Sequence, residues 1–346
     1  MAGNQELTSV SNTRVIFLSK AHCRQRLSRS PHWSATDFEV LSVLVSCSQR
    51  SVYLTRCRYT GRLFCLKVYN KRELSNTSQG VKNSLEQVYR EIHNHGKVTG
   101  HAGVVPLFCA FENNLAVVLV IEWQSESITL STLFSGGKLS PTVAQQVTAG
   151  LLTSVAELHN SNVLHGDLKP ENVLYNPKRN EIKLFDFGLS FDLSVERPTT
   201  PSGTLCYCAP EVVRSLLPSN NETEPGERQA KCEYGLKSDI WSCGVIIYQL
   251  LKGKLPFRGN ERIACVRNIL SSELPDMTGI SEMQVRFLKR ALEMEPVLRA
   301  SALDLLCEQW LAPGGLLRIK QRLQWTMRRN RISFPRLPNI CIGAHT

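Results

Sequence analysis

The pattern of apolar and polar residues predicts strands in the first part of the chain. In the stretch RLFCLKVY every second residue is apolar, and Cys65 and Lys67 share the opposite face, which is the two-residue period of a strand. The stretch LAVVLVIEW is a continuous apolar run that is typical of a buried strand. Between them, LEQVYREIHNHGKV has apolar residues at helical spacing. We therefore predict a strand-rich unit with one main helix.

After about Glu122 the spacing becomes helical. The stretch SPTVAQQVTAGLLTSVAELHNSN begins with Ser140, a favourable N-cap, and Pro141, a favourable first helical residue. Further helices are predicted in SDIWSCGVIIYQLLKG, ERIACVRNILSS and EMQVRFLKRALEM. The pattern as a whole predicts an α+β fold with a small strand-rich lobe and a larger, mainly helical lobe.

Composition shifts suggest three parts of the chain. Residues 1–37 are predicted to be a basic extension, 38–311 a folded domain, and 312–346 a basic tail. The domain divides into a first lobe, 38–123, and a second lobe, 124–311. The polar stretch 217–235 is expected to be a surface loop inserted in the second lobe.

Composition and charge indicate a folded protein without a membrane span, and they bear on its cellular location and its partners. Hydrophobic residues make up 42% of the 346 residues, which allows a sizeable core. No apolar run approaches the roughly 18–20 residues of a membrane span, and the first residues lack a signal-peptide pattern. The twelve cysteines lack regular spacing, which favours reduced thiols and a cytoplasmic or nuclear location, or both. The net charge of +11 comes from clusters at the two ends, which leaves open an anionic partner for the tails, although plain solvated tails are favoured.

The stretch VLHGDLKPENVLYN carries the clearest chemistry. Asp167 is followed two residues on by Lys169 and five residues on by Asn172. Phosphoryl transfer needs a carboxylate that receives the proton of an attacking hydroxyl, a cation near the phosphate, and oxygen ligands for Mg²⁺. Nineteen residues after Asp167, the stretch FDFG offers a second Mg²⁺ ligand in Asp186.

These motifs resemble those of the eukaryotic protein kinases. Others in 38–311 do so too, in the order that the family shows: CLKVY and YREI before them, and GTLCYCAPE, SDIWSCG and EPVLRA after them. The resemblance implies a bilobal fold that uses ATP and Mg²⁺. It implies that Asp167 is the catalytic base, that Lys169 steadies the γ-phosphate, and that Asn172 and Asp186 bind Mg²⁺.

The resemblance also implies a nucleotide pocket. Lys67 would hold the α- and β-phosphates and pair with Glu91, which is favoured over Glu86 as the helix glutamate. Ile121 would be the gatekeeper beside the adenine, and the backbone of the following residues would meet the adenine edge. The other residues implied around the nucleotide are Val45, Val52, Cys65, Glu122, Gln124 and Leu174.

Further resemblance concerns the substrate and regulation. Lys169 after DL and Thr204 in GTLCY follow the serine/threonine pattern, which implies protein substrates phosphorylated on serine or threonine. The segment RPTTPSGTLCY is similar to the activation segments of the Aurora and calcium/calmodulin-type groups. It contains candidate phosphorylation sites, with Thr200 first. Gly166 stands where most relatives carry an arginine that holds the activation-segment phosphate, so we expect switching at Thr200 to be less decisive. The ion pair Glu211–Arg299 is expected to be structural, and Asp239 is expected to brace the catalytic loop.

One departure leaves the activity open. In VSCSQRSV the three glycines of the family's phosphate loop fall on Val45, Cys47 and Arg50. Bulky residues there are expected to stiffen or lift the loop, because glycine allows close approach of the backbone to phosphates. Arg50 could reach a phosphate, although a solvent-facing side chain is favoured. An active kinase is favoured over the alternative, a pseudokinase scaffold with weak or no catalysis.

Overall fold

The computed structural model describes residues 14–18, 34–75, 84–134, 139–215, 234–259, 261–271, 273 and 275–311. The predicted C-terminal tail and nearly all of the predicted insertion 217–235 lie outside the described residues. Within the described ranges, none of the helices combines the length and apolar character that crossing a bilayer requires.

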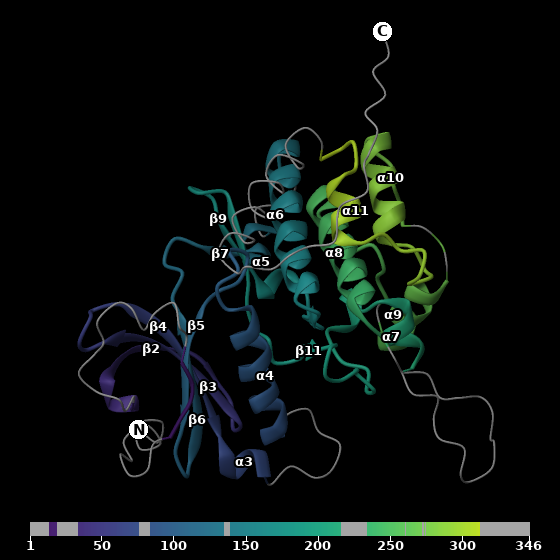
Figure 1. The fold of residues 1–346 in the computed structure, drawn as a ribbon. Helices are drawn as coiled ribbons and strands as arrows, with labels where there is room; N and C mark the ends of the chain where they lie inside the picture. The colour runs from purple at the N-terminus through teal and green to yellow at the C-terminus, as the bar shows by residue number, and fades with distance from the viewer. Residues whose placement is uncertain are drawn as a thin grey trace, which may run out of the picture.

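The first lobe is built on an antiparallel sheet with the strand order β1-β5-β6-β4-β3-β2 (Figure 1). The predicted alternation in RLFCLKVY is present, because Phe64, Leu66 and Val68 pack in the core while Lys67 faces the other side. The strands are β1 (Arg14–Leu18), β2 (Phe38–Ser46), β3 (Arg50–Cys57), β4 (Leu63–Asn70), β5 (Leu107–Glu112) and β6 (Ala116–Glu122).

The helix α4 (Leu85–Val98) covers one face of this sheet, after the short helix α3 (Lys71–Ser75). It begins at Ser84, whose side chain accepts a hydrogen bond from Gln87 N at 3.2 Å. Its buried apolar residues, among them Val88 and Ile92, pack in one cluster with residues of β4, β5 and β6. This packing sets the position of Glu91, a polar residue of the same helix.

The second lobe is mainly helical, as the pattern predicts, with α6 and α8 at its centre (Figure 1). The predicted start of α6 is confirmed, since Ser140 caps it by accepting from Val143 N at 3.3 Å and Pro141 is its first residue. The helices are α5 (Leu130–Phe134), α6 (Pro141–Asn160), α7 (Pro210–Arg214), α8 (Leu236–Lys252), α9 (Arg262–Leu270), α10 (Glu282–Ala291) and α11 (Ala302–Leu306).

Short strands and turns of this lobe carry the motifs HGDLKPEN and DFG. The strands form the sheets β10-β9-β7 and β11-β8. They are β7 (Ile128–Thr129), β8 (Val163–Leu164), β9 (Val173–Asn176), β10 (Glu181–Leu184) and β11 (Phe191–Asp192). The motif HGDLKPEN lies between β8 and β9, and DFG follows β10, so the antiparallel pairing of β9 with β10 brings the two motifs together.

The strand β1 was not predicted from the sequence. Residues 14–18, within the predicted extension, form β1 and pair with β5. Ile16 packs against the cluster that holds α4 on the sheet, and Arg14 lies 4.0 Å from Glu112. The strand depends on the free edge of β5, and that edge is not visible in the local pattern of residues 14–18.

Candidate active site

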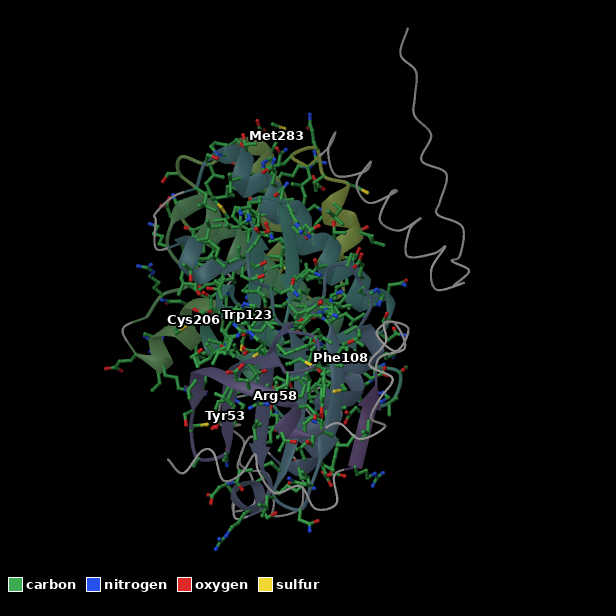
Figure 2. The ribbon with its side chains drawn as sticks, turned by 90° about the vertical axis from the view of Figure 1, so that its left-hand side faces the viewer. Tyr53, Arg58, Phe108, Trp123, Cys206 and Met283 are labelled. Atoms are coloured by element: carbon green, nitrogen blue, oxygen red, sulfur yellow. The ribbon has the colours of Figure 1, made fainter. Side chains whose placement is uncertain are left out.

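A cleft of about 590 Å³ lies where the two lobes meet, in the volume range of small-molecule sites. Figure 2 shows Trp123 at the junction of the strand-rich and helical parts. Leu44 and Phe185, which directly precede the predicted residues Val45 and Asp186, also line the cleft without having been predicted. Val105 lines it too, and no predicted site residue is its neighbour in the sequence. The predicted nucleotide-site residues that line it are Val45, Val52, Cys65, Lys67, Ile121, Glu122, Gln124, Leu174 and Asp186.

Lys67 is the buried centre of the charged groups in the cleft. Its Nζ lies 2.7 Å from Glu91 Oε1 and 2.7 Å from Asp186 Oδ1, and only 5% of the residue is exposed. Tyr69 donates a hydrogen bond to the second oxygen of Glu91 at 2.6 Å. Glu86, the alternative partner, is exposed in the first turn of α4. The structure therefore pairs Lys67 with Glu91, as the resemblance implies.

Lys67 and Asp186 are kept ionised by the charged side chains around them. Burial alone would lower the pKa of Lys67, but Asp186 and Glu91 outweigh burial and keep that pKa well above its ordinary value. Burial would raise the pKa of Asp186, but Lys67 and then Arg50 hold it below its usual range. Both groups are therefore charged at neutral pH, which suits the binding of phosphate and of a metal cation.

The loop HGDLKPEN, which is the catalytic loop of the resemblance, is braced by Asp239 of α8. Asp239 accepts hydrogen bonds from His165 N at 2.9 Å and from Gly166 N at 3.0 Å, and its Oδ2 lies 2.9 Å from His159 Nε2. These contacts fix the backbone just before Asp167. The bracing role that the resemblance implies for Asp239 is thus present as geometry.

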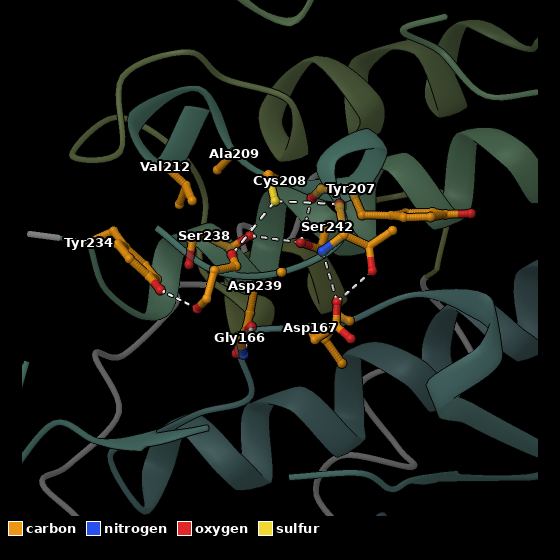
Figure 3. A pocket seen from close by; sticks show the side chains of 14 residues that line it. Gly166, Asp167, Tyr207, Cys208, Ala209, Val212, Tyr234, Ser238, Asp239 and Ser242 are labelled. Carbon is orange, nitrogen blue, oxygen red and sulfur yellow. Dashed lines mark hydrogen bonds between the residues drawn. The ribbon is translucent and has the colours of Figure 1, made fainter. Parts of the chain in front are cut away.

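Asp167 is surrounded by donors. Its Oδ1 accepts from Thr204 N at 2.9 Å and from Thr204 Oγ1 at 2.8 Å, and its Oδ2 lies 2.7 Å from Lys169 Nζ. Lys169 Nζ also donates to Thr204 Oγ1 at 2.9 Å. Figure 3 shows Asp167 with its hydrogen bonds beside the small pocket formed with the activation segment. The carboxylate and the cation that phosphoryl transfer needs are therefore adjacent and tied to one threonine hydroxyl.

Asn172 and Asp186 offer the oxygen atoms for a metal. Asn172 Nδ2 donates to Asp167 O at 2.8 Å, and Phe185 N donates to Asn172 O at 3.2 Å, which brings Asn172 against the residue before Asp186. Among the described residues no group of three or more His, Cys, Asp or Glu side chains gathers to hold a metal alone. One carboxylate and one amide oxygen fit Mg²⁺, which usually completes its shell with water and substrate phosphates.

A column of three rings fixes the backbone next to Asp186. Phe187 is fully buried between His95 of α4, with ring centroids 4.6 Å apart, and His165 of the catalytic loop, at 5.2 Å. His95 Nε2 lies 2.7 Å from Val105 O. Because Phe187 is held inside, Asp186 points toward Lys67 and the cleft.

The loop without glycine is a tight turn between β2 and β3. Cys47 N donates to Arg50 O at 2.9 Å, and Asn70 N donates to Gln49 O at 3.0 Å, which ties the tip of the turn to the end of β4. None of the residues 45–50 has a positive φ, so the turn does not require glycine. The loop is not lifted from the cleft, since Val45 and Arg50 line it.

Arg50 does not point into solvent, so that expectation is wrong. Its Nη1 lies 3.9 Å from Asp186 Oδ2, and 35% of its side chain is exposed. It is one of the residues that line the cleft. The attraction of Asp186 draws the guanidinium inward, which the sequence pattern could not indicate.

The candidate phosphorylation sites of the activation segment differ in exposure, and an ion pair holds the end of the segment. Thr199 and Thr200 are exposed, whereas the hydroxyl of Ser202 lies 2.8 Å from Tyr234 Oη. The guanidinium of Arg299 donates to both oxygens of Glu211, at 2.8 and 2.9 Å. The expected ion pair is thus present in bidentate form and anchors the end of the segment to the helical lobe.

Comparisons with known proteins agree with this geometry. The family model described as "Protein kinase domain" matches residues 38–311. The liver/testis isoform of the phosphorylase b kinase gamma catalytic chain from Bos taurus is 31% identical over 259 residues, which cover 73% of this chain and 61% of the relative. Calcium-dependent protein kinase 4 from Plasmodium falciparum is 28% identical over 283 residues, covering 80% of this chain and 49% of the relative.

A plant relative gives the same result. Calcium-dependent protein kinase 25 from Arabidopsis thaliana is 31% identical over 264 residues, which cover 74% of this chain and 46% of the relative. The chain thus spans about half the length of the curated relatives it matches, from 46% to 61% in these three cases.

Proposed function

Because the chain belongs to the protein kinase family, we propose that it transfers the γ-phosphate of ATP to serine and threonine hydroxyls of protein substrates. The observation that carries the proposal is the arrangement around Asp167, whose carboxylate lies 2.7 Å from Lys169 Nζ and accepts from Thr204. The names of the relatives support the same reaction class, since two of them are calcium-dependent protein kinases.

The reaction follows from the groups in the cleft. The substrate hydroxyl oxygen forms a bond to the γ-phosphorus, the bond to the bridging β,γ-oxygen breaks, and Asp167 receives the hydroxyl proton. Lys169 offsets negative charge beside Asp167, and Lys67 binds phosphate while Glu91 orients it. Mg²⁺ held by Asn172 and Asp186 would neutralise charge on the phosphates.

The pseudokinase alternative rested on the missing glycines. The turn closes without left-handed backbone, and the cleft beside it has room for a nucleotide. The charged groups that act on phosphate are in contact with one another. These observations favour the enzyme over the scaffold.

The experiment is phosphate incorporation from radiolabelled ATP and Mg²⁺ into a generic protein substrate, followed by identification of the phosphorylated amino acids. We expect phosphoserine and phosphothreonine with the wild type and none with Asp167→Asn. Wild-type protein that is folded and binds ATP but incorporates nothing would leave the scaffold as the better account. Incorporation on tyrosine would contradict the serine/threonine assignment.

A further inference from the structure

Arg50 stands at the first position of β3, where the family's phosphate loop has its third glycine. In the register of β3 with β4, Arg50 lies opposite Tyr69 and Val52 lies opposite Lys67. Residues two apart on a strand share a face, so Arg50, Val52 and Lys67 face the same cleft, and all three line it. The register of the sheet thus starts the side chain on the cleft face, and the attraction of Asp186 draws its guanidinium inward.

Two cations flank the carboxylate of Asp186. Lys67 Nζ lies 2.7 Å from Oδ1, and Arg50 Nη1 lies 3.9 Å from Oδ2. A separation of 3.9 Å is an ion pair and not a hydrogen bond, so the contact with Asp186 does not occupy the N–H groups of the guanidinium. Tyr69, opposite Arg50 on β4, also interacts with it. The side chain is 35% exposed, which allows a ligand in the cleft to reach it.

In this turn a side-chain cation, Arg50, lies where the family's phosphate loop has a glycine. In a glycine loop, backbone N–H groups approach the phosphates. Here Cys47 N is engaged within the turn by Arg50 O, and Cys47 Sγ lies 3.1 Å from the same oxygen. Arg50 adds positive charge and up to five N–H donors beside the anionic part of the site. Guanidinium groups suit phosphate because they can donate two parallel hydrogen bonds.

We propose that Arg50 binds the phosphates of the nucleotide directly and gives ATP binding a component that does not depend on Mg²⁺. The proposal rests on the proposed function, because ATP is its ligand. It assigns to one side chain of this loop the charge compensation that the family obtains from the backbone and the metal.

Isothermal titration of the full chain tests this, with ATP and adenosine as probes, each with Mg²⁺ and with EDTA. In EDTA the wild type should bind ATP more tightly than adenosine. Arg50→Ala should weaken ATP binding roughly ten- to hundredfold in both conditions, as for loss of a charged hydrogen bond, and leave adenosine binding unchanged. Arg50→Lys should recover part of the loss.

Arg56 offers a matched control on the same strand. It is half exposed and lies 3.9 Å from Glu39, away from the cleft. Arg56→Ala removes the same charge from β3 and should leave the affinity for ATP unchanged. A loss of equal size in Arg56→Ala would show a general charge effect and would overturn the proposal.

Two further outcomes overturn it. Unchanged ATP affinity in Arg50→Ala would mean that the guanidinium does not touch the phosphates. Tighter binding of ATP with Mg²⁺ in that variant would mean that Arg50 competes with the metal for Asp186. In either case adenosine and ATP still bind and the proposed function stands, whereas wild-type protein that binds neither would remove both.

Discussion

At the scale of single residues, Gly166 has a backbone conformation and surroundings that favour glycine. Its φ is +77°, and a Cβ built on it would lie 2.3 Å from Leu189 O. Asp239 fixes this backbone by accepting from Gly166 N. In this backbone conformation a side chain at position 166 would be strained and would meet the residue that follows the DFG motif.

The first prediction concerns Gly166→Ala. A left-handed non-glycine residue costs about 1–2 kcal/mol, and the contact with Leu189 O adds to it because the oxygen belongs to the backbone. We expect a larger loss of unfolding free energy, measured with urea, than for Gly61→Ala. Gly61 has φ +68° and nothing within 4 Å of the added Cβ, so it carries the strain alone. Equal losses in the two variants would contradict the clash.

His95 is the second residue whose environment has a measurable consequence. It stacks on Phe187, and burial lowers the pKa of His95 to about 4. The unfolded chain therefore takes up a proton below about pH 6.5, and the folded chain does so only near pH 4. The free energy of unfolding should fall as the pH falls through this window.

The contribution of His95 should amount to about 3 kcal/mol between pH 6.5 and pH 4. His95→Leu should reduce the slope of unfolding free energy against pH in this window, measured by urea unfolding at several pH values. An unchanged slope in His95→Leu would show that its ring is not neutral and buried as described.

At the scale of elements, α4 is joined to the start of the activation segment by polar contacts. Lys97 Nζ lies 2.6 Å from Asp192 Oδ2, and Arg90 Nε lies 2.6 Å from Glu196 Oε1. Asn94 donates to the Ser190 backbone carbonyl at 2.9 Å. The segment is therefore held against α4 without a phosphate, at the helix that also carries the partner of Lys67.

These contacts predict that activity does not depend on phosphorylation of Thr200. Thr200 is exposed, so Thr200→Ala should change the rate of phosphate transfer by no more than about twofold. Lys97→Met should lower kcat, because it removes the cation nearest to buried Asp192, which His93 approaches only to 3.6 Å, and loosens α4. Abolished transfer in Thr200→Ala, or an unaffected Lys97→Met, would show that a phosphate and not these ion pairs holds the segment.

The elements differ in how far the sequence predicts them. The helix α6 was predicted with its first residue, because Ser140 and Pro141 act locally. The strand β4 was predicted because its two faces differ along RLFCLKVY. The strand β1 was missed, because its stability comes from pairing with β5 nearly a hundred residues away. A local sequence pattern therefore predicts an element that is stabilised by its own residues, and not one that is stabilised by a distant strand.

At the scale of the whole molecule, the site exists only where the lobes meet. Lys67 and Glu91 come from the strand-rich lobe, and Asp167 and Asp186 come from the helical lobe. These four residues could be predicted, because each lies at a fixed place in a short motif that can be read along the chain. The inward position of Arg50 could not be predicted, because it depends on the distance of 3.9 Å to Asp186 across the cleft.

Whether Asp167 acts as the catalytic base is tested most directly by the rate of phosphate transfer by the wild type and by Asp167→Asn at saturating ATP and Mg²⁺, with ATP affinity measured for both. We predict transfer by the wild type, a drop of at least about a hundredfold in kcat for the variant, as expected for loss of a general base, and similar affinities for ATP. Equal rates in the two proteins, or no transfer by wild-type protein that binds ATP, would contradict the account.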